Sequence, residues 1–334
     1  NFVQSRTSML DIFLTTFVVG GFLCLVLDRR WIDRRTGPPQ TYRAQARDEL
    51  PLPPDRPPSP LFRPWRLLAG VAFGAALATK WSGGLALLAG ILLAFAWERS
   101  RRAEIGLAHP WWEALRDELF GLSLFLVLVP AAVYLASYAR YFADHGFDLA
   151  AWYQVQRGMA EFSIQLRASH PYASRPWSWM LMTRPVAYFY KGAGSGASAT
   201  SAEILGIGNP VVFWLGIPAL LWTAVAWVRR RDWRAGLIMV AFSVQYFPWF
   251  LAARTAFLFY MAPITPFMVM GGTYALRDLW EARIGDTEAR AFGPLVPLLI
   301  VASVGMFAFF FPVLIGQTMS YQAWHTRMWF RSWI

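Results

Sequence analysis

Residues 298–314 read LLIVASVGMFAFFFPVL and residues 119–135 read LFGLSLFLVLVPAAVYL, and neither run contains a charged side chain. A helix needs about 20 apolar residues to cross the hydrocarbon core of a bilayer, and each run supplies most of that length. In the whole chain 56% of the residues are hydrophobic and only 15% are charged, whereas soluble domains carry about 25% charged residues. We therefore predict an all-α integral membrane protein, built as a multi-span helical bundle.

The chain is also strongly basic, with 31 Lys and Arg against 20 Asp and Glu and a net charge of +11. Such a charge can indicate nucleic-acid binding, but here the arginines cluster at the ends of apolar runs. Basic residues in short loops beside membrane helices stay on the cytoplasmic side and set the topology. We therefore expect no nucleic-acid partner. The single cysteine, Cys24, lies inside an apolar run and excludes an intrachain disulfide.

Apolar runs divide the chain into about eight candidate spans. They fall at about 8–27, 67–79, 83–97, 119–138, 210–228, 235–253, 256–276 and 293–316. The stretch 67–97 reads either as one long helix or as two short helices joined at residues 80–84. Two crossings are favoured because they place most basic residues, including the run 229–231, in cytoplasmic loops. Gly70 and Gly74 have the spacing that lets membrane helices approach closely.

This topology predicts three regions. Residues 1–138 form the first membrane helices, with an Arg- and Pro-rich cytoplasmic loop at 28–66 that is typical of an extended connector. Residues 139–209 form an extracytoplasmic loop, in which the Gly- and Ser-rich stretch 192–201 is expected to be a flexible linker. Residues 210–334 form a C-terminal four-helix membrane region with an outer tail.

Three basic residues stand at the outer ends of predicted helices: Arg6, Lys80 and Arg254. Ionisable groups at membrane depth are costly, and they therefore indicate function. Together they suit the phosphate of a lipid-linked substrate, because Arg binds phosphate through two N–H groups and Lys binds it as a point charge. The alternative is that each side chain snorkels to the headgroup layer. For Lys80, followed by Trp81 between two short helices, we favour a functional role.

The outer loop is rich in aromatic and basic side chains, reading HPYASRPWSW at residues 170–179 with an Arg-Pro pair at 184–185. Aromatic faces stack on sugars, and His and Arg bind hydroxyls or phosphate. The alternative is an aromatic belt at the membrane surface. The candidate sugar- or acceptor-binding residues of this loop are His170, Tyr172, Trp177 and Arg184.

The acidic residues on the outer side do not have the paired spacing that would nominate a general base. They are Asp144, Asp148, Glu161 and Glu203. Asp11, just after the start of the first helix, reads as a local cap or ion-pair partner. The chain contains no zinc-type cluster of His and Cys and no glycine-rich nucleotide motif, so we expect neither a metal nor a cofactor.

Several stretches resemble the protein O-mannosyltransferase family, in particular its actinobacterial members that use polyprenyl-phosphate-mannose. The stretches are residues 5–11 (SRTSMLD), 78–83 (ATKWSG), the loop at 170–185, 208–210 (GNP) and 254–260 (RTAFLFY). Each is short, but their order and spacing together make the resemblance specific.

The resemblance implies a glycosyltransferase of the GT-C type, with a fold of about eleven spans. Such enzymes take mannose from polyprenyl-phosphate-mannose, which is a substrate and not a cofactor, and pass it with inversion to Ser or Thr hydroxyls of exported proteins. The reaction would take place at the outer face of the plasma membrane, with membrane lipid and the secretion translocon as further partners. Arg6, Lys80 and Arg254 would then bind the carrier phosphate, and Trp81 would join the substrate-binding residues.

One part of the family pattern is missing from the chain. The family's Asp-Glu pair, which supplies the catalytic base, lies in a first outer loop and is expected upstream of Asn1, together with three more spans. The chain alone is therefore expected to be an inactive fragment. The pairs Asp48-Glu49 and Asp117-Glu118 have the same sequence but fall in predicted cytoplasmic loops, so we do not assign them as the catalytic pair.

Three other functions compete with this one. Another GT-C enzyme with a different sugar or acceptor would keep the same phosphate site. A non-catalytic membrane scaffold subunit would fit a chain without a base. A secondary transporter would require inverted repeats and charges near the bilayer midplane, and neither is found in the sequence.

Overall fold

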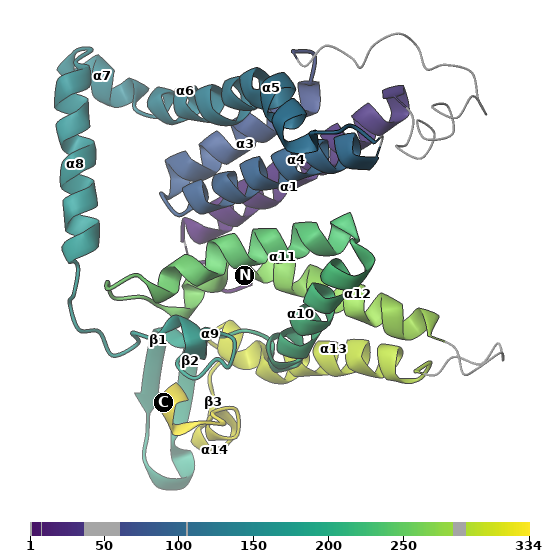
Figure 1. Cartoon of the computed structure of the whole chain (residues 1–334). Coiled ribbons are helices and arrows are strands. Elements are labelled where there is room, and N and C mark those ends of the chain that lie inside the picture. Colours follow the sequence, from purple (N-terminus) through teal and green to yellow (C-terminus); the bar gives the residue numbers. More distant parts are fainter. Residues whose placement is uncertain (1, 8, 37–60, 105, 283–291) are drawn as a thin grey trace. The chain divides into compact units, whose positions relative to one another are not determined.

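The computed structural model describes residues 2–7, 9–36, 61–104, 106–282 and 292–334, and most of them are helical (Figure 1). The contacts within the chain divide it into two compact units. Unit 1 consists of Asn1–Ile12 and Ala150–Ile334, and unit 2 consists of Phe13–Leu149. Of the Arg- and Pro-rich loop predicted at 28–66, residues 37–60 lie outside the described residues. Residues 28–36 and 64–66 are helical, so the predicted ends of this loop are wrong.

Unit 2 is a bundle of helices. They are most of α1 (Asp11–Thr36), α3 (Pro64–Thr79), α4 (Gly83–Glu104), α5 (Pro110–Ser123), a π-helical turn (Leu124–Leu128), α6 (Val129–Ala136) and α7 (Ala139–His145). The chain between α3 and α4 turns back at Lys80, whose backbone is extended, and the Gly83 N–H donates to the Lys80 carbonyl at 2.8 Å. A Cβ on Gly83 would lie 2.5 Å from the carbonyl carbon of Ala76. Only glycine permits this close approach. Because α3 and α4 are separate helices, the prediction of two helices in residues 67–97 is confirmed.

Two glycines let α3 pack closely against the long helix formed by α5, the π-helical turn and α6. A Cβ on Gly70 would lie 1.9 Å from the carbonyl oxygen of Phe125, and a Cβ on Gly74 would lie 2.8 Å from Cβ of Val133. The backbones are therefore in direct contact, as the small-residue spacing of the sequence predicts.

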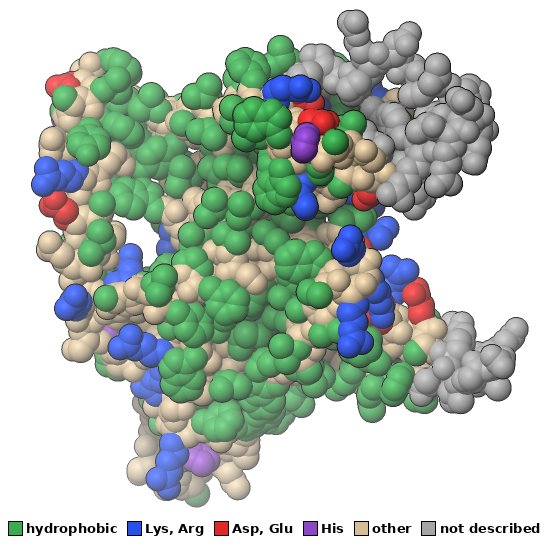
Figure 2. Space-filling model, in the orientation of Figure 1, with side chains coloured by type: hydrophobic (Ala, Val, Ile, Leu, Met, Phe, Trp, Pro, Cys, Tyr) green, Lys and Arg blue, Asp and Glu red, His purple; other side chains and the backbone are tan. Residues whose placement is uncertain are grey.

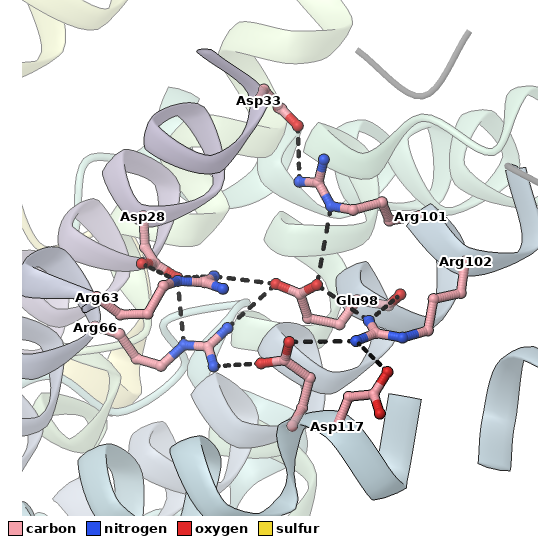
Figure 3. A network of polar contacts seen from close by, with 9 residues as sticks. Asp28, Asp33, Arg63, Arg66, Glu98, Arg101, Arg102 and Asp117 are labelled. Carbon is pink, nitrogen blue, oxygen red and sulfur yellow. Dashed lines mark hydrogen bonds and ion pairs between the residues drawn. The ribbon is translucent and has the colours of Figure 1, made fainter. Parts of the chain in front are cut away.

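A buried network of charged side chains joins four helices of unit 2 (Figure 3). Arg63, which precedes α3, donates to Asp28 of α1 at 2.6 Å and to Glu98 of α4 at 3.0 Å. Arg66 of α3 donates to Glu118 of α5 at 2.7 Å and also contacts Asp28 and Glu98. Burying these charges is tolerated because each guanidinium meets more than one carboxylate.

Unit 1 combines membrane helices with a small sheet. Its helices are α8 (Leu149–Gln165), which starts one residue before the unit, α9 (Pro176–Trp179), α10 (Pro210–Arg230), α11 (Trp233–Tyr246), α12 (Thr265–Glu281), α13 (Leu295–Leu314) and α14 (Tyr321–His325). Short 3₁₀ turns at Phe247–Phe250 and Leu258–Met261 lie between α11 and α12. The α10 helix starts at an Asn209 cap, whose side-chain oxygen accepts from the N–H groups of Val211 and Val212.

The sheet has the order β1-β2-β3 and is antiparallel throughout. Strands β1 (Val186–Ala193) and β2 (Thr200–Gly206) form a hairpin, and β3 (Met319–Ser320) pairs with the start of β2 (Figure 1). The expectation that residues 192–201 form a flexible linker is therefore wrong. Gly194 and Gly196, both with positive φ, form the turn of this hairpin.

The described helices support the membrane assignment. Five are long and apolar enough to cross a bilayer: Asp11–Arg35, Gly83–Glu104, Pro110–Ala136, Pro210–Arg230 and Leu295–Leu314. The α3, α11 and α12 helices overlap predicted spans but have only 16, 14 and 17 residues, fewer than the 18 required of a candidate span. Hydrophobic side chains cover much of the surface in view (Figure 2), and on α13 Leu298, Val301 and Val304 are well exposed. The chain is an integral membrane protein, and the number of spans stays a prediction.

Candidate functional site

Unit 1 contains a cavity of about 290 Å³ between two irregular segments, one after α8 and the other between α11 and α12. Its lining residues are Arg167, Ala168, Ser169, Ala173, Ser174, Arg175, Ala253, Arg254, Thr255 and Ala256. Backbone hydrogen bonds fix the two segments to each other: Thr255 N–H donates to Leu166 at 3.2 Å, and Ser174 N–H donates to Ala256 at 2.8 Å. The cavity is therefore formed without any ligand. We call it the arginine cavity.

The arginine cavity is strongly basic. Arg167, Arg175 and Arg254 line it, and its lining contains no carboxylate. Within the described part of the chain, none of these three arginines has an ion-pair partner. Arg254 makes one long hydrogen bond, from Nη2 to the Tyr260 hydroxyl at 3.4 Å, and its Nε is buried without a partner. Three arginines in one lining suit an anion, because a guanidinium can bind a phosphate through two N–H groups.

Two of the predicted substrate-binding residues lie on the cavity's own loop. The Nδ1 atom of His170 accepts from the backbone N–H of Tyr172 at 3.2 Å, and the His170 ring meets the edge of Phe257 at 5.1 Å. Trp177, in the short helix α9, is exposed. These contacts place an imidazole and a phenol ring on the segment that lines the cavity.

Arg184 has a structural role that the sequence does not indicate. Its guanidinium donates to the carbonyl oxygens of Pro171 (2.9 Å), Ile334 (3.1 Å) and Ser332, and it lies 5.1 Å from the centre of the Tyr172 ring. It thereby ties the 170–172 turn to the C-terminal segment. Its proposed contact with substrate stays a prediction, and most of its donors already have partners.

Arg6 does not line the arginine cavity. Its guanidinium lies 3.9 Å from the centre of the Phe2 ring and donates to the Phe2 carbonyl and to Ser5 Oγ. Phe2 in turn lines a separate apolar cavity of about 220 Å³ in the same unit. The side-chain amide of Gln4 donates to the Phe259 carbonyl at 3.2 Å, which fixes this N-terminal segment to the turn that follows Arg254.

Asp11 is the buried carboxylate of this region, with 2% of its surface exposed. Burial raises the pKa of Tyr188 to about 12, and the Asp11 charge adds to the effect. Burial also raises the pKa of Tyr260, where the Arg254 charge acts in the opposite direction and the Asp11 charge in the same direction. Both phenols are therefore neutral at physiological pH, and the Tyr260 hydroxyl accepts a hydrogen bond from Arg254. Sequence reasoning treated Asp11 as a local cap and did not select either tyrosine.

Lys80 and Trp81 belong to unit 2, at the turn between α3 and α4. The indole Nε1 of Trp81 donates to the Tyr134 hydroxyl at 2.7 Å, and this hydroxyl lies 3.3 Å from that of Tyr138. The Trp81 ring is therefore held in a fixed orientation next to Lys80. Tyr134 and Tyr138 were missed, because only the fold brings a residue more than 50 positions away against this turn.

The sequence contains two Asp-Glu pairs, Asp48-Glu49 and Asp117-Glu118, and the structure describes only the second. Glu118 belongs to the buried charge network, and Asp117 contacts Arg102 and Arg116. Both carboxylates therefore have structural partners, and the location of the catalytic pair stays a prediction. Asp48-Glu49 lies outside the described residues. Among the described residues, no group of three or more His, Cys, Asp and Glu side chains could hold a metal ion.

The apolar membrane helices and the basic cavity of unit 1 suit a membrane protein that handles a substrate with a phosphate group. Comparison with known proteins makes the assignment specific. The family model "Dolichyl-phosphate-mannose-protein mannosyltransferase" matches residues 56–144, and the model "C-terminal four TMM region of protein-O-mannosyltransferase" matches residues 148–333. The chain belongs to the protein O-mannosyltransferase family.

Similar proteins agree with this assignment. The polyprenol-phosphate-mannose–protein mannosyltransferase of Mycobacterium tuberculosis is 33% identical over all of this chain and 68% of its own length. The enzyme of the same name from Mycolicibacterium smegmatis is 32% identical over all of this chain and 69% of its own length. The structure of the Saccharomyces cerevisiae protein O-mannosyltransferase Pmt1-Pmt2 complex bound to the sugar donor matches with a TM-score of 0.64. The match has 13% sequence identity and covers 81% of this chain and 69% of that chain. It shows that this chain has the GT-C fold.

Proposed function

We propose that this chain transfers mannose from polyprenyl-phosphate-mannose to Ser or Thr hydroxyls of proteins that are being exported. The observation that carries the proposal is the arginine cavity, which is lined by three arginines and by no carboxylate. A sugar phosphate needs such a set of cations. The lipid-linked sugar is itself the donor, so the proposed reaction requires no separate cofactor or metal.

The chemistry divides into two tasks. In the transfer, the acceptor oxygen forms a bond to C1 of mannose while the bond from C1 to the phosphate oxygen breaks, and the hydroxyl proton passes to a base. The leaving phosphate gains negative charge as its bond to C1 breaks. Arg254 and the neighbouring arginines stabilise this charge, because the site holds their positive groups in place before the reaction. A carboxylate is the natural base for the acceptor hydroxyl, and the lining of the arginine cavity does not supply one.

We further propose that the reaction takes place at the extracytoplasmic face of the plasma membrane. The short basic turn formed by Arg229, Arg230 and Arg231 lies at the C-terminal end of α10. The β1-β2 hairpin comes just before the N-terminal end of the same helix. By the positive-inside rule the basic turn is cytoplasmic. The arginine cavity, between α11 and α12 at their opposite ends, then faces outward, where acceptors leaving the secretion translocon would reach it.

The test is mannose transfer from polyprenyl-phosphate-mannose to a Ser/Thr-rich acceptor peptide in membranes that contain the full protein. We expect Arg254→Ala to lower the transfer rate by about 10²- to 10³-fold, the usual effect of removing one donor that stabilises a developing charge. Lys80→Ala should also lower it. The matched control is Arg157→Ala, since Arg157 is exposed and pairs only with Glu161 at 2.8 Å.

All three variants should insert into the membrane at the wild-type level. Undiminished transfer by Arg254→Ala would remove the cavity from the reaction. Transfer to a lipid acceptor but not to the peptide would favour a GT-C enzyme with another acceptor. A full-length protein that transfers no mannose to either would favour the scaffold function.

A further inference from the structure

Residues 332–334, which we call the C-terminal brace, are bonded to the residues that precede strand β1. The indole Nε1 of Trp333 donates to the Met182 carbonyl at 2.7 Å. The Ser332 hydroxyl donates to the Thr183 carbonyl. Two neighbouring residues of the brace therefore hold two neighbouring residues that lie about 150 positions earlier in the chain.

The packing of unit 1 fixes the brace itself. Trp333 is 1% exposed, and its ring lies 6.0 Å from that of Phe310 on α13 and stacks on that of Trp329. Its partner Met182 is fully buried and has a positive φ of 54°. A residue other than glycine keeps such a backbone only where its surroundings hold it there. The Trp333 hydrogen bond to the Met182 carbonyl is part of those surroundings.

Arg184 links the brace to the loop of the arginine cavity. Its Nη1 donates to the carbonyls of Ser332 and, at 3.1 Å, of Ile334, while its Nε donates to the Pro171 carbonyl at 2.9 Å. A guanidinium is planar, and its N–H groups point in fixed directions. Arg184 therefore holds Pro171 at a set distance from the brace.

The loop held in this way lines the arginine cavity. Pro171 is followed by Ser174 and Arg175, which both belong to the cavity lining. On the other side of the loop, the Ser174 N–H donates to the Ala256 carbonyl at 2.8 Å, two residues beyond Arg254. A displacement of Pro171 would therefore move Arg175 relative to Arg254.

We infer that Arg184 and Trp333 are positioning residues of the arginine cavity. The brace fixes Arg184, and Arg184 fixes the loop that carries Arg175, so that this arginine and Arg254 face one anion together. Trp333 is too deeply buried to touch a substrate, so its effect passes through the brace. Where it concerns the donor phosphate, the inference rests on the proposed function.

Distances between spin labels test the positioning without catalysis. The full-length protein in lipid vesicles carries Cys24→Ala and two labelled cysteines, Ala173→Cys on the loop and Val228→Cys near the C-terminal end of α10; both positions are exposed. Pulsed electron paramagnetic resonance should give one narrow distance distribution. We expect Trp333→Phe, which keeps a ring but removes the N–H donor, and Arg184→Met to broaden or shift it.

Two matched controls and a milder variant accompany these changes. Trp329→Phe and Arg331→Lys alter side chains of the same turn, where Trp329 is 39% exposed and Arg331 is also exposed, and both should keep the narrow distribution. Ser332→Ala removes only the hydroxyl that donates to Thr183. It should broaden the distribution as well, and it serves if Trp333→Phe does not fold.

The kinetics of mannose transfer test the consequence for the donor. The KM for polyprenyl-phosphate-mannose should rise about 10-fold in Trp333→Phe and in Arg184→Met, because a displaced Arg175 weakens a charged hydrogen bond to the phosphate. A loss of folded protein alone would lower the maximal rate and leave this KM unchanged. In the Arg184→Met background, Trp333→Phe should add little, since both changes act on the same loop.

Two outcomes would overturn the inference. One is an unchanged distance distribution in both Trp333→Phe and Arg184→Met, whatever their transfer rates. The other is a donor KM that rises in Arg184→Met but not in Trp333→Phe, because Arg184 would then bind the donor itself. If the wild-type protein transfers no mannose, the proposed function is wrong, and the distance distributions alone decide whether the brace positions the loop.

Discussion

The guanidinium of Arg184 illustrates what a single residue type can and cannot indicate. Its place beside His170 and Tyr172 in the sequence suggested substrate contact, yet in the fold its N–H groups meet three carbonyl oxygens. Arg254 is the opposite case, because one long hydrogen bond to Tyr260 is its only hydrogen bond among the described residues. The difference in unused donors makes Arg254 the stronger candidate for binding an anion.

Glu203 is a second residue whose environment only the fold creates. It lies on β2, is 2% exposed, and accepts from the indole Nε1 of Trp324 at 2.5 Å. Burial raises the pKa of Glu203, and the Trp324 hydrogen bond acts in the opposite direction. Because the folded-state pKa is raised above the unfolded-state value, the unfolded chain ionises first. The carboxyl then lowers stability as the pH rises through the range between the two pKa values.

We therefore predict that Glu203→Gln raises the unfolding temperature at pH 8 and leaves it unchanged near pH 3, where the carboxyl is protonated in both states. The amide oxygen of Gln can still accept from Trp324, so the packing is kept. Unfolding in detergent micelles, followed by tryptophan fluorescence across the pH series, measures the effect. Glu161→Gln, at an exposed position on α8, is the control and should show no pH-dependent gain.

At the scale of elements, backbone contact fixes how α3 packs in unit 2. Gly70 and Gly74 lie where any side chain would collide with the π-helical turn or α6, and Gly83 closes the turn onto the end of α3. The spacing of the glycines was visible in the sequence. Their partner, the helix that begins at Pro110, was not, because a small-residue motif does not specify which helix it will meet.

The Gly70 contact yields a prediction for stability. Gly70→Ala places a Cβ 1.9 Å from the Phe125 carbonyl oxygen, and relieving such overpacking in a close-packed interior costs about 1–3 kcal/mol. Gly20→Ala is the matched control, since no atom lies within 4 Å of the added Cβ. The reaction of half-buried Cys24 with a thiol-reactive dye during heating reports the unfolding of unit 2. Equal unfolding temperatures for the two variants would contradict the close contact.

At the scale of the whole molecule, each unit is held together in its own way. Unit 1 has an aromatic core around Trp179 and Trp333, whereas unit 2 joins α1, α3, α4 and α5 through buried charges (Figure 3). Arg66 is central to that network, because it contacts carboxylates from three different helices. Burying such a network costs desolvation free energy, and removing one of its partners lowers the stability of the fold strongly.

We expect Arg66→Met to destabilise unit 2 by about 3–5 kcal/mol, since it removes a buried cation shared by Asp28, Glu98 and Glu118 and leaves three buried carboxylates with fewer cationic partners. Arg116→Met, which removes an exposed pair with Asp117, should leave the unfolding temperature unchanged. The same Cys24 labelling assay compares the two variants. A small effect of Arg66→Met would mean that water or a neighbouring arginine compensates the freed carboxylates.

Sequence reasoning found the membrane helices and the residues of the family motifs, because hydropathy and short motifs are local properties of the chain. It placed His170, Tyr172 and Arg254 in outer segments, and the fold brings the 170–175 turn and Arg254 together at one cavity. It missed Arg167 and Arg175, although both are charged residues of that loop. Their significance depends on having no acidic neighbour in space, and the sequence does not contain that information.

The sequence by itself determined that this protein is embedded in a membrane, where its helices lie, and which family it resembles. Apolar length and charge asymmetry suffice for this because the bilayer acts on each segment separately. Only the tertiary structure decided which charges are used in structure and which are free, that residues 186–206 form a hairpin, and that three arginines share one cavity. These features depend on contacts between residues far apart in the chain, such as Arg184 with Ser332 or Thr255 with Leu166.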